Sequence, residues 1–258
     1  DTNTQRELSL SALIDLMEDV DVLFFGEEHN DSIAHLLQDK IYEQLLRQYG
    51  EVALSLEMFE TDNQQVIDEY LAGYITESKL VNDARAWQNY PTDYRPMLER
   101  AKLLRQAVIA ANAPRRYVNM VSRKGLDELR KLPRDSRAYL PPLPIFTEDI
   151  AYRQRFFELM GGVHADTGSA RFFHAQCTWD ATMAYEIYKH WKKHKRGKIF
   201  HLNGRFHTDY QQGIMTQLQR YKQKIRMKNI SCFRVADWSE LDWKEHEALG
   251  DILIVSEQ

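Results

Sequence analysis

Short apolar runs alternate with helical patterns along the whole chain. Six runs have the length and unbroken hydrophobicity of strands buried on both faces, at residues 21–26, 51–59, 107–112, 198–204, 229–235 and 251–256. Between them, apolar residues recur at helical spacing, at residues 8–18, 30–49, 63–72, 76–85, 149–160, 170–195 and 211–222. This alternation predicts an α/β fold with a parallel or mostly parallel central sheet flanked by helices.

One segment interrupts the alternation. Residues 131–147 contain Pro133, Pro141, Pro142 and Pro144, and the helical pattern that follows stops at Gly161-Gly162. The length of 258 residues is that of one large domain. We therefore expect a single α/β domain over residues 1–258, in which residues 131–170 form a helical insertion that contributes to ligand binding.

The composition excludes several classes of protein. Apolar side chains make up 43% of the residues, which is too many for a disordered chain, and the net charge of −4 argues against nucleic acid as a partner. Every apolar stretch falls well short of the roughly 20 residues of a membrane-spanning helix. Cys177 and Cys232 are too few for a thiolate zinc site. They would be able to pair in an exported protein, or would pack as two small buried hydrophobes.

Polar side chains gather where the predicted strands end. His29 and His207 each follow a strand in a Gly-x-x-His turn, Glu57 lies near the end of the second strand, and Asn112 ends the third. Ligands of open α/β sheets bind beyond the carboxyl ends of the strands, so we expect these side chains to face one cleft. His29, Glu57 and His207 are candidates for binding a divalent metal or for general acid–base catalysis. The structural alternative for each histidine is a helix cap or a surface position.

Six segments carry a resemblance to a known family. GEEHNDSIAH, SLEMFETDNQQ, WQNYPTDYRPML, AANAPRRYV, AQCTWDATMA and HLNGRFHTDY resemble the ChaN-like haem-binding uptake family of bacterial, often iron-regulated, lipoproteins. The wider superfamily includes Tiki-type metalloproteases and erythromycin-esterase-like hydrolases, in which such strand-end positions are thought to be catalytic.

The resemblance implies a haem-binding protein of bacterial iron uptake. The family is associated with tyrosinate ligation of the haem iron and with two haems stacked face to face in a dimer. The CxxCH attachment motif is absent, so haem would be held non-covalently and exchangeably. The resemblance also implies a homodimer promoted by haem, an outer-membrane haem receptor as a possible partner, and a place in the cell envelope, either lipid-anchored at the outer membrane or periplasmic.

Residues 149–164 are the best local candidate for the haem site. Tyr152, Phe156, Met160 and His164 recur every four residues and would line one stripe of a helix. Together they offer a phenolate for the iron, a ring for the porphyrin, a thioether and an imidazole. The structural alternative is an amphipathic helix with aromatic core contacts, which Gly161-Gly162 would end before His164.

Other residues compete for these roles. Four further tyrosines are candidate ligands, Tyr90, Tyr94, Tyr139 and Tyr210, and six basic residues are candidate propionate partners, Arg115, Arg116, Arg123, Lys124, Arg153 and Arg155. Asp180 would pair with a cation or orient a histidine. The alternative function is a metal-dependent hydrolase, an esterase or peptidase, that uses His29, Glu57 and His207.

Overall fold

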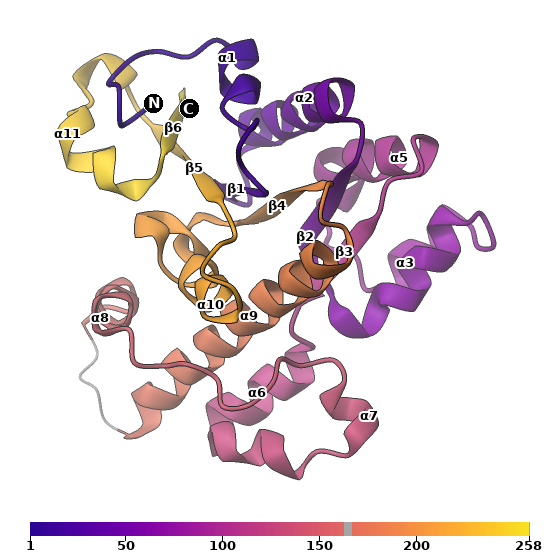
Figure 1. The fold of residues 1–258 in the computed structure, drawn as a ribbon. Helices are drawn as coiled ribbons and strands as arrows, with labels where there is room; N and C mark the ends of the chain where they lie inside the picture. The colour runs from indigo at the N-terminus through magenta and orange to yellow at the C-terminus, as the bar shows by residue number, and fades with distance from the viewer. Residues whose placement is uncertain (163–166, 258) are drawn as a thin grey trace.

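A computed structural model describes residues 1–162 and 167–257. Its centre is one sheet of six parallel strands, which confirms the predicted fold class (Figure 1). The strands are β1 (Val22–Glu27), β2 (Val52–Glu60), β3 (Val108–Asn112), β4 (Lys198–Gly204), β5 (Met227–Val235) and β6 (Ile252–Glu257). Their order is β3-β2-β4-β1-β5-β6, so β4 lies between β2 and β1. This order makes the polar carboxyl ends of β1, β4 and β2 neighbours.

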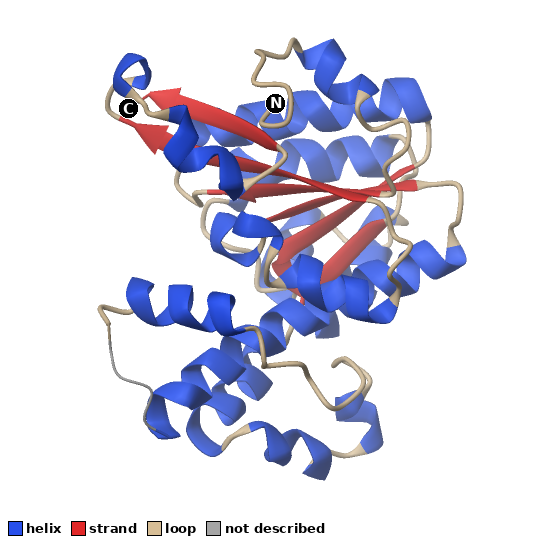
Figure 2. Ribbon diagram, turned by 60° about the vertical axis from the view of Figure 1, so that its left-hand side comes forward, coloured by secondary structure: helices blue, strands red, loops and turns tan. Residues whose placement is uncertain are grey.

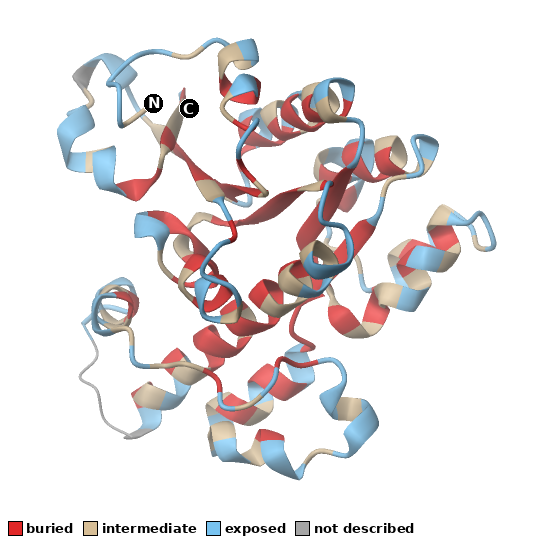
Figure 3. Cartoon of the chain, in the orientation of Figure 1, coloured by how far each residue is buried: buried red, intermediate tan, exposed pale blue. Residues whose placement is uncertain are grey.

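Helices cover both faces of the sheet (Figure 2). One face packs on residues of α1 (Leu10–Asp15), α2 (Ser32–Tyr49), α3 (Gln64–Leu71), α4 (Glu77–Asp83) and α5 (Arg95–Leu103). The other face packs on the long helix α9 (Thr167–Lys193) and on α10 (Ile214–Tyr221). Because both faces are covered, every residue of β1 is buried, and the continuous hydrophobicity of the strand patterns follows from this (Figure 3).

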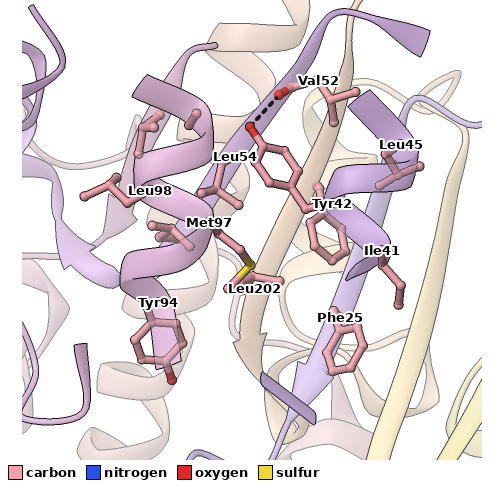
Figure 4. Close-up of a cluster of buried hydrophobic side chains, with 14 of the residues drawn as sticks. Phe25, Ile41, Tyr42, Leu45, Val52, Leu54, Tyr94, Met97, Leu98 and Leu202 are labelled. Atoms are coloured by element: carbon pink, nitrogen blue, oxygen red, sulfur yellow. Dashed lines mark hydrogen bonds between the residues drawn. The ribbon is translucent and has the colours of Figure 1, made fainter. Parts of the chain in front are cut away.

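The packing between α2, α5 and the sheet shows how the main core is held (Figure 4). The ring of Tyr42 stacks on Phe200 at 6.1 Å between centroids, and its hydroxyl donates to the carbonyl of Val52 over 3.1 Å. Because of this hydrogen bond, the phenol of Tyr42 is buried without leaving its hydroxyl unpaired. Met97 and Leu98 of α5 pack from the adjacent helix and are fully buried.

A second group of helices lies beside the sheet and has its own apolar core. It consists of α6 (Arg115–Lys124), α7 (Arg134–Arg137), α8 (Ile150–Leu159) and the first turns of α9 (Figure 2). Buried side chains such as Val121, Leu129, Phe156 and Phe173 form this core. Residues 131–170 thus supply α7, α8 and the start of α9, and their status as an insertion stays a prediction. Helix α11 (Trp243–His246) is a short turn before β6.

Two expectations from composition are also settled for the described residues. Cys177 in α9 and Cys232 in β5 are both buried and unpaired, so they pack as small hydrophobes. None of the helices in the described ranges is long and apolar enough to cross a bilayer.

Candidate functional site

The two Gly-x-x-His turns interlock at the carboxyl ends of β1 and β4. Gly26 pairs with Asn203 across the two strands, and Glu27 pairs with Gly204. A Cβ atom on Gly26 would lie 2.8 Å from the Cα of Arg205, and one on Gly204 would lie 2.8 Å from Nε2 of His29. Both glycines are therefore required for close approach, and each turn fixes the position of the other. This explains why the same motif follows two neighbouring strands.

His29 is held by a buried carboxylate at the end of β1. Its Nδ1 lies 2.8 Å from Oε1 of Glu27, which is 1% exposed and also accepts a 2.5 Å hydrogen bond from the hydroxyl of Tyr94. Burial alone lowers the pKa of His29, but the hydrogen bond to Glu27 and the charge of Glu57 outweigh it and leave that pKa raised. From the sequence, Glu27 is one of the polar residues after the first predicted strand, and no role follows for it because that strand is predicted to stop at Gly26. A charged residue directly after an apolar run was the available signal.

Glu57 links the two turns from the neighbouring strand β2. It is 7% exposed, and its Oε2 accepts a 2.7 Å hydrogen bond from the backbone N–H of Gly204. Its Oε1 lies 3.5 Å from Nε2 of His207. The expectation of a buried, inward carboxylate at this position is confirmed, and the backbone N–H together with His207 compensates its charge.

The long helix α9 contacts the other ring nitrogen of His207, Nδ1, through Asp180. Its Nδ1 lies 2.6 Å from Oδ1 of Asp180, a fully buried residue whose Oδ2 accepts a 2.9 Å hydrogen bond from the hydroxyl of Tyr152. Asp180 orients a histidine, as the sequence predicts. Burial lowers the pKa of His207, but the charges of Glu57 and Asp180 outweigh it and raise that pKa to about 9. His207 is thus a cation at neutral pH, held between two carboxylates.

This charge makes stability depend on pH. The pKa of His207 is higher in the folded state than its ordinary value of 6.5, so its stabilising contribution is complete below pH 6.5 and is lost as pH rises to about 9. We expect the free energy of unfolding to fall by about 2–3 kcal/mol across this range. Urea unfolding of wild type and His207→Gln measures it, and an NMR titration of His207 gives its pKa directly. An equal slope in both proteins, or a His207 pKa near 6.5, would contradict the assignment.

The predicted strand-end residues do come together, but the described residues show no metal site. His29, Glu57 and His207 meet at the strand ends, and Asn112 lines the same cavity as Glu57 and His207. Within residues 1–162 and 167–257, no three His, Cys, Asp or Glu side chains are arranged to hold a metal ion. The geometry instead provides two histidine–carboxylate pairs, which suit proton transfer.

The predicted haem stripe on α8 does not form one exposed surface. Tyr152 is 2% exposed and Phe156 is 8% exposed, because both pack into the helical core beside Phe173. Met160 follows the last residue of α8 and is 51% exposed, and His164 lies outside the described residues. Burial and the charge of Asp180 raise the pKa of the Tyr152 phenol well above its ordinary value.

Helix α8 instead braces the turn that carries His207. Besides the hydroxyl of Tyr152, which reaches Asp180, the guanidinium of Arg155 donates to the carbonyls of Phe206 and Asp209 over 2.8 and 2.7 Å. The nitrogen Nε2 of Gln176 lies 3.0 Å from the Tyr152 hydroxyl and 3.1 Å from Nδ1 of His207. Arg155, a predicted propionate partner, is thus committed to the backbone.

A cavity opens from the strand ends to the surface. Its inner chamber has a volume of about 190 Å³ and reaches Glu57, Asn112 and His207. An outer vestibule of about 870 Å³ continues from it. Both parts are lined by Glu60, Arg85, Trp87 and Arg115.

Comparisons with known proteins agree with this architecture. The fold is similar to a solved structure described as cofacial haem binding to ChaN of Campylobacter jejuni, with a TM-score of 0.71 and 17% identity over 98% of this chain and 94% of that one. It is also similar to the type III effector HopBA1, with a TM-score of 0.53 and 13% identity over 96% and 93% of the two chains. A mutant of the erythromycin esterase EreC gives a TM-score of 0.51 and 11% identity over 91% and 76%. These likenesses show the fold.

The sequence itself shows the family. It has no significant match among curated proteins. Residues 13–218, which include both Gly-x-x-His turns, Glu57, Asp180 and the cavity between them, match the family described as haem-binding uptake, Tiki superfamily, ChaN. The chain therefore belongs to the ChaN family of haem-binding uptake proteins within the Tiki superfamily.

Proposed function

We propose that this protein binds haem non-covalently and serves in bacterial haem or iron uptake. The observation that carries the proposal is the family match over residues 13–218, and the likeness in fold to a ChaN whose structure is described by its cofacial haem binding supports it. On the family resemblance alone, we also propose a place in the cell envelope, either lipid-anchored at the outer membrane or periplasmic, with an outer-membrane haem receptor as a partner.

A tyrosine is the proposed iron ligand, and Tyr152 stays the predicted one. In the described conformation its hydroxyl is hydrogen-bonded to Asp180 and Gln176, so ligation requires the phenol to leave these partners and release its proton to solvent as the phenolate binds the iron. Of the competing tyrosines, Tyr90 and Tyr94 are each 1% exposed, whereas Tyr139 and Tyr210 are 36% and 43% exposed. The last two are accessible to haem without any rearrangement.

Hemin titration tests haem binding and assigns the ligand. We expect wild type to shift the Soret band and to show the charge-transfer bands of a tyrosinate complex, and Tyr152→Phe to lose those bands. Tyr74→Phe, at a residue that is 82% exposed, is the matched control and should behave as wild type. If the charge-transfer bands are lost in Tyr139→Phe or Tyr210→Phe but kept in Tyr152→Phe, the iron ligand is that other tyrosine and not Tyr152. No spectral change at micromolar wild-type protein would overturn the proposal itself.

Dimerisation by haem is proposed on the exposed apolar surface of the helical group. Ile150 and Leu159 of α8, Met160 directly after it, and Phe172 of α9 are between 51% and 82% exposed. A porphyrin has two apolar faces, and burying the second against another subunit removes it from water. Light scattering during the same titration should show a mainly monomeric apo protein and a dimer with one haem per chain. A strict monomer that holds haem tightly would rule this arrangement out.

Hydrolysis is the second candidate function, and the pairing of His29 with Glu27 favours it. A carboxylate on Nδ1 leaves Nε2 free to accept a proton, which is the arrangement of a general base. This argument supports acid–base chemistry, whereas the metal-dependent version has no ligand cluster among the described residues. Ester or peptide turnover that is lost in His29→Ala and His207→Ala would favour the hydrolase function. Metal retained in the purified protein would favour a metal-dependent hydrolase.

A further inference from the structure

Two carboxylates, Glu57 and Glu60, line the cavity beyond the strand ends. The carboxylate of Glu57 already accepts from the N–H of Gly204 and lies beside His207, and that of Glu60 pairs with Arg85 over 2.7 Å. Each of the two carboxylates that line the cavity therefore already faces a donor or a cation.

Several hydrogen-bond donors that line the cavity have no acceptor within residues 1–162 and 167–257. Asn112 is 9% exposed, and its Oδ1 accepts from the N–H of Ala113, but its Nδ2 has no acceptor in the described part of the chain. The indole N–H groups of Trp87 and Trp179 likewise have no acceptor among the described residues. These N–H groups are free to donate to a ligand in the cavity, so the cavity favours a ligand that brings acceptor atoms.

Charge at the mouth of the cavity points to the same conclusion. Arg85 pairs with Glu60 and with Asp62, the latter over 2.6 Å, and Arg116 pairs with Asp62 as well. Arg115 lines both the chamber and the vestibule, yet it forms no ion pair or hydrogen bond with any described residue. One uncompensated guanidinium thus stands at the boundary between the two spaces.

The positive charge of Arg115, unpaired in the part of the chain that the structure describes, matches a ligand group with one negative charge. A carboxylate neutralises a single guanidinium, and its two oxygens fit the paired N–H groups of arginine. A phosphate dianion would bring a second charge toward Glu57, which lies in the same chamber. The cavity therefore favours a carboxylate over a phosphate.

Size and side-chain type describe the rest of the ligand. The inner chamber of about 190 Å³ equals roughly six water volumes, so it takes a short group and excludes a porphyrin. The vestibule of about 870 Å³ falls in the range of ordinary ligand pockets. Trp87 lines both spaces and offers an aromatic surface to a flat or apolar body.

We propose that this cavity is a carboxylate-binding site, in which Arg115 and Asn112 hold the carboxylate and Trp87 contacts the body of the ligand. The inference stands on the cavity itself and does not require haem binding. The carboxylate has two possible sources, a small free aromatic or apolar acid that enters the chamber, or a propionate of a haem whose ring stays in the vestibule.

Isothermal titration with benzoate, and with benzamide as its uncharged analogue, tests the site. We expect benzoate to bind wild type and Arg115→Gln to weaken it by about tenfold or more, because a hydrogen-bonded charge is lost. Arg47→Gln removes the same charge from the exposed end of α2, where the guanidinium pairs with Glu43 over 2.6 Å, and should change affinity by less than about twofold.

Asn112→Asp provides a second, nearly isosteric variant. It keeps the oxygen that accepts from Ala113 and replaces the free donor by an acceptor, so benzoate affinity should fall while the circular dichroism spectrum stays that of wild type. Equal benzoate binding by wild type and Arg115→Gln, or benzamide binding as well as benzoate, would overturn the proposal.

A hemin arm separates the two sources. If hemin displaces benzoate and binds more weakly to Arg115→Gln than to Arg47→Gln, the carboxylate is a haem propionate. If hemin and benzoate bind together, the site takes a small free acid, and haem binds elsewhere. If wild type binds no benzoate and its hemin affinity is independent of Arg115, the cavity is no carboxylate site, whether or not the protein binds haem.

Discussion

Asp180→Ala should destabilise the fold by about 3–5 kcal/mol. Asp180 is fully buried and accepts from Nδ1 of His207 over 2.6 Å and from the hydroxyl of Tyr152 over 2.9 Å. Its removal leaves a buried imidazolium with one carboxylate where it had two, and a buried hydroxyl without its acceptor. Chemical denaturation at pH 7 measures the loss.

Two further variants make this test specific. Asp135→Ala removes a carboxylate from the exposed helix α7 and should change stability by less than about 0.5 kcal/mol. Asp180→Asn keeps an acceptor near His207 but removes one of the two charges that raise its pKa to about 9, so the NMR-measured pKa of His207 should fall. If Asp180→Ala lost no more stability than Asp135→Ala, the contacts of Asp180 with His207 and Tyr152 would not contribute to the stability of the fold.

Gly26→Ala should cost about 1–3 kcal/mol, because the added methyl group has no space. Its Cβ would lie 2.8 Å from the Cα of Arg205 and 3.0 Å from Oγ1 of Thr208, inside the interlocked turns at the strand ends. Backbone atoms cannot rotate away as a side chain can, so β1 or the turn after β4 must shift. Equilibrium unfolding gives the cost, and the NMR signals of His29 and His207 should move as well.

Gly197→Ala is the matched control for this effect. Its Cβ would lie 3.0 Å from Oε1 of Glu51, but that carboxylate is the end of a side chain that is 59% exposed and held by a surface contact with His194, so it can rotate away at small cost. The substitution also restricts the unfolded chain, so we expect it to be neutral or slightly stabilising. Equal stability of Gly26→Ala and Gly197→Ala would mean that the turns are not closely interlocked.

The sequence by itself determined the layers of this protein. Parallel strands covered on both faces must be apolar on both faces, and all six apolar runs correspond to β1–β6 within a few residues. The carboxyl ends of parallel strands share one edge, so the meeting of His29, Glu57 and His207 was also predictable from where each one follows its strand. Because these inferences depend only on local periodicity and strand direction, they needed no knowledge of distant contacts.

Tertiary structure alone decided what those side chains contact. Periodicity places Tyr152 on a helix stripe, but which way the stripe faces depends on how α8 packs, and it packs inward so that the phenol reaches Asp180, 28 residues away. Glu27 became part of the site because Tyr94, from a turn 67 residues further along the chain, donates to it. The free guanidinium of Arg115 is visible only once the partners of Arg85 and Arg116 are known. Such contacts join residues that are distant in sequence, and local patterns carry no information about them.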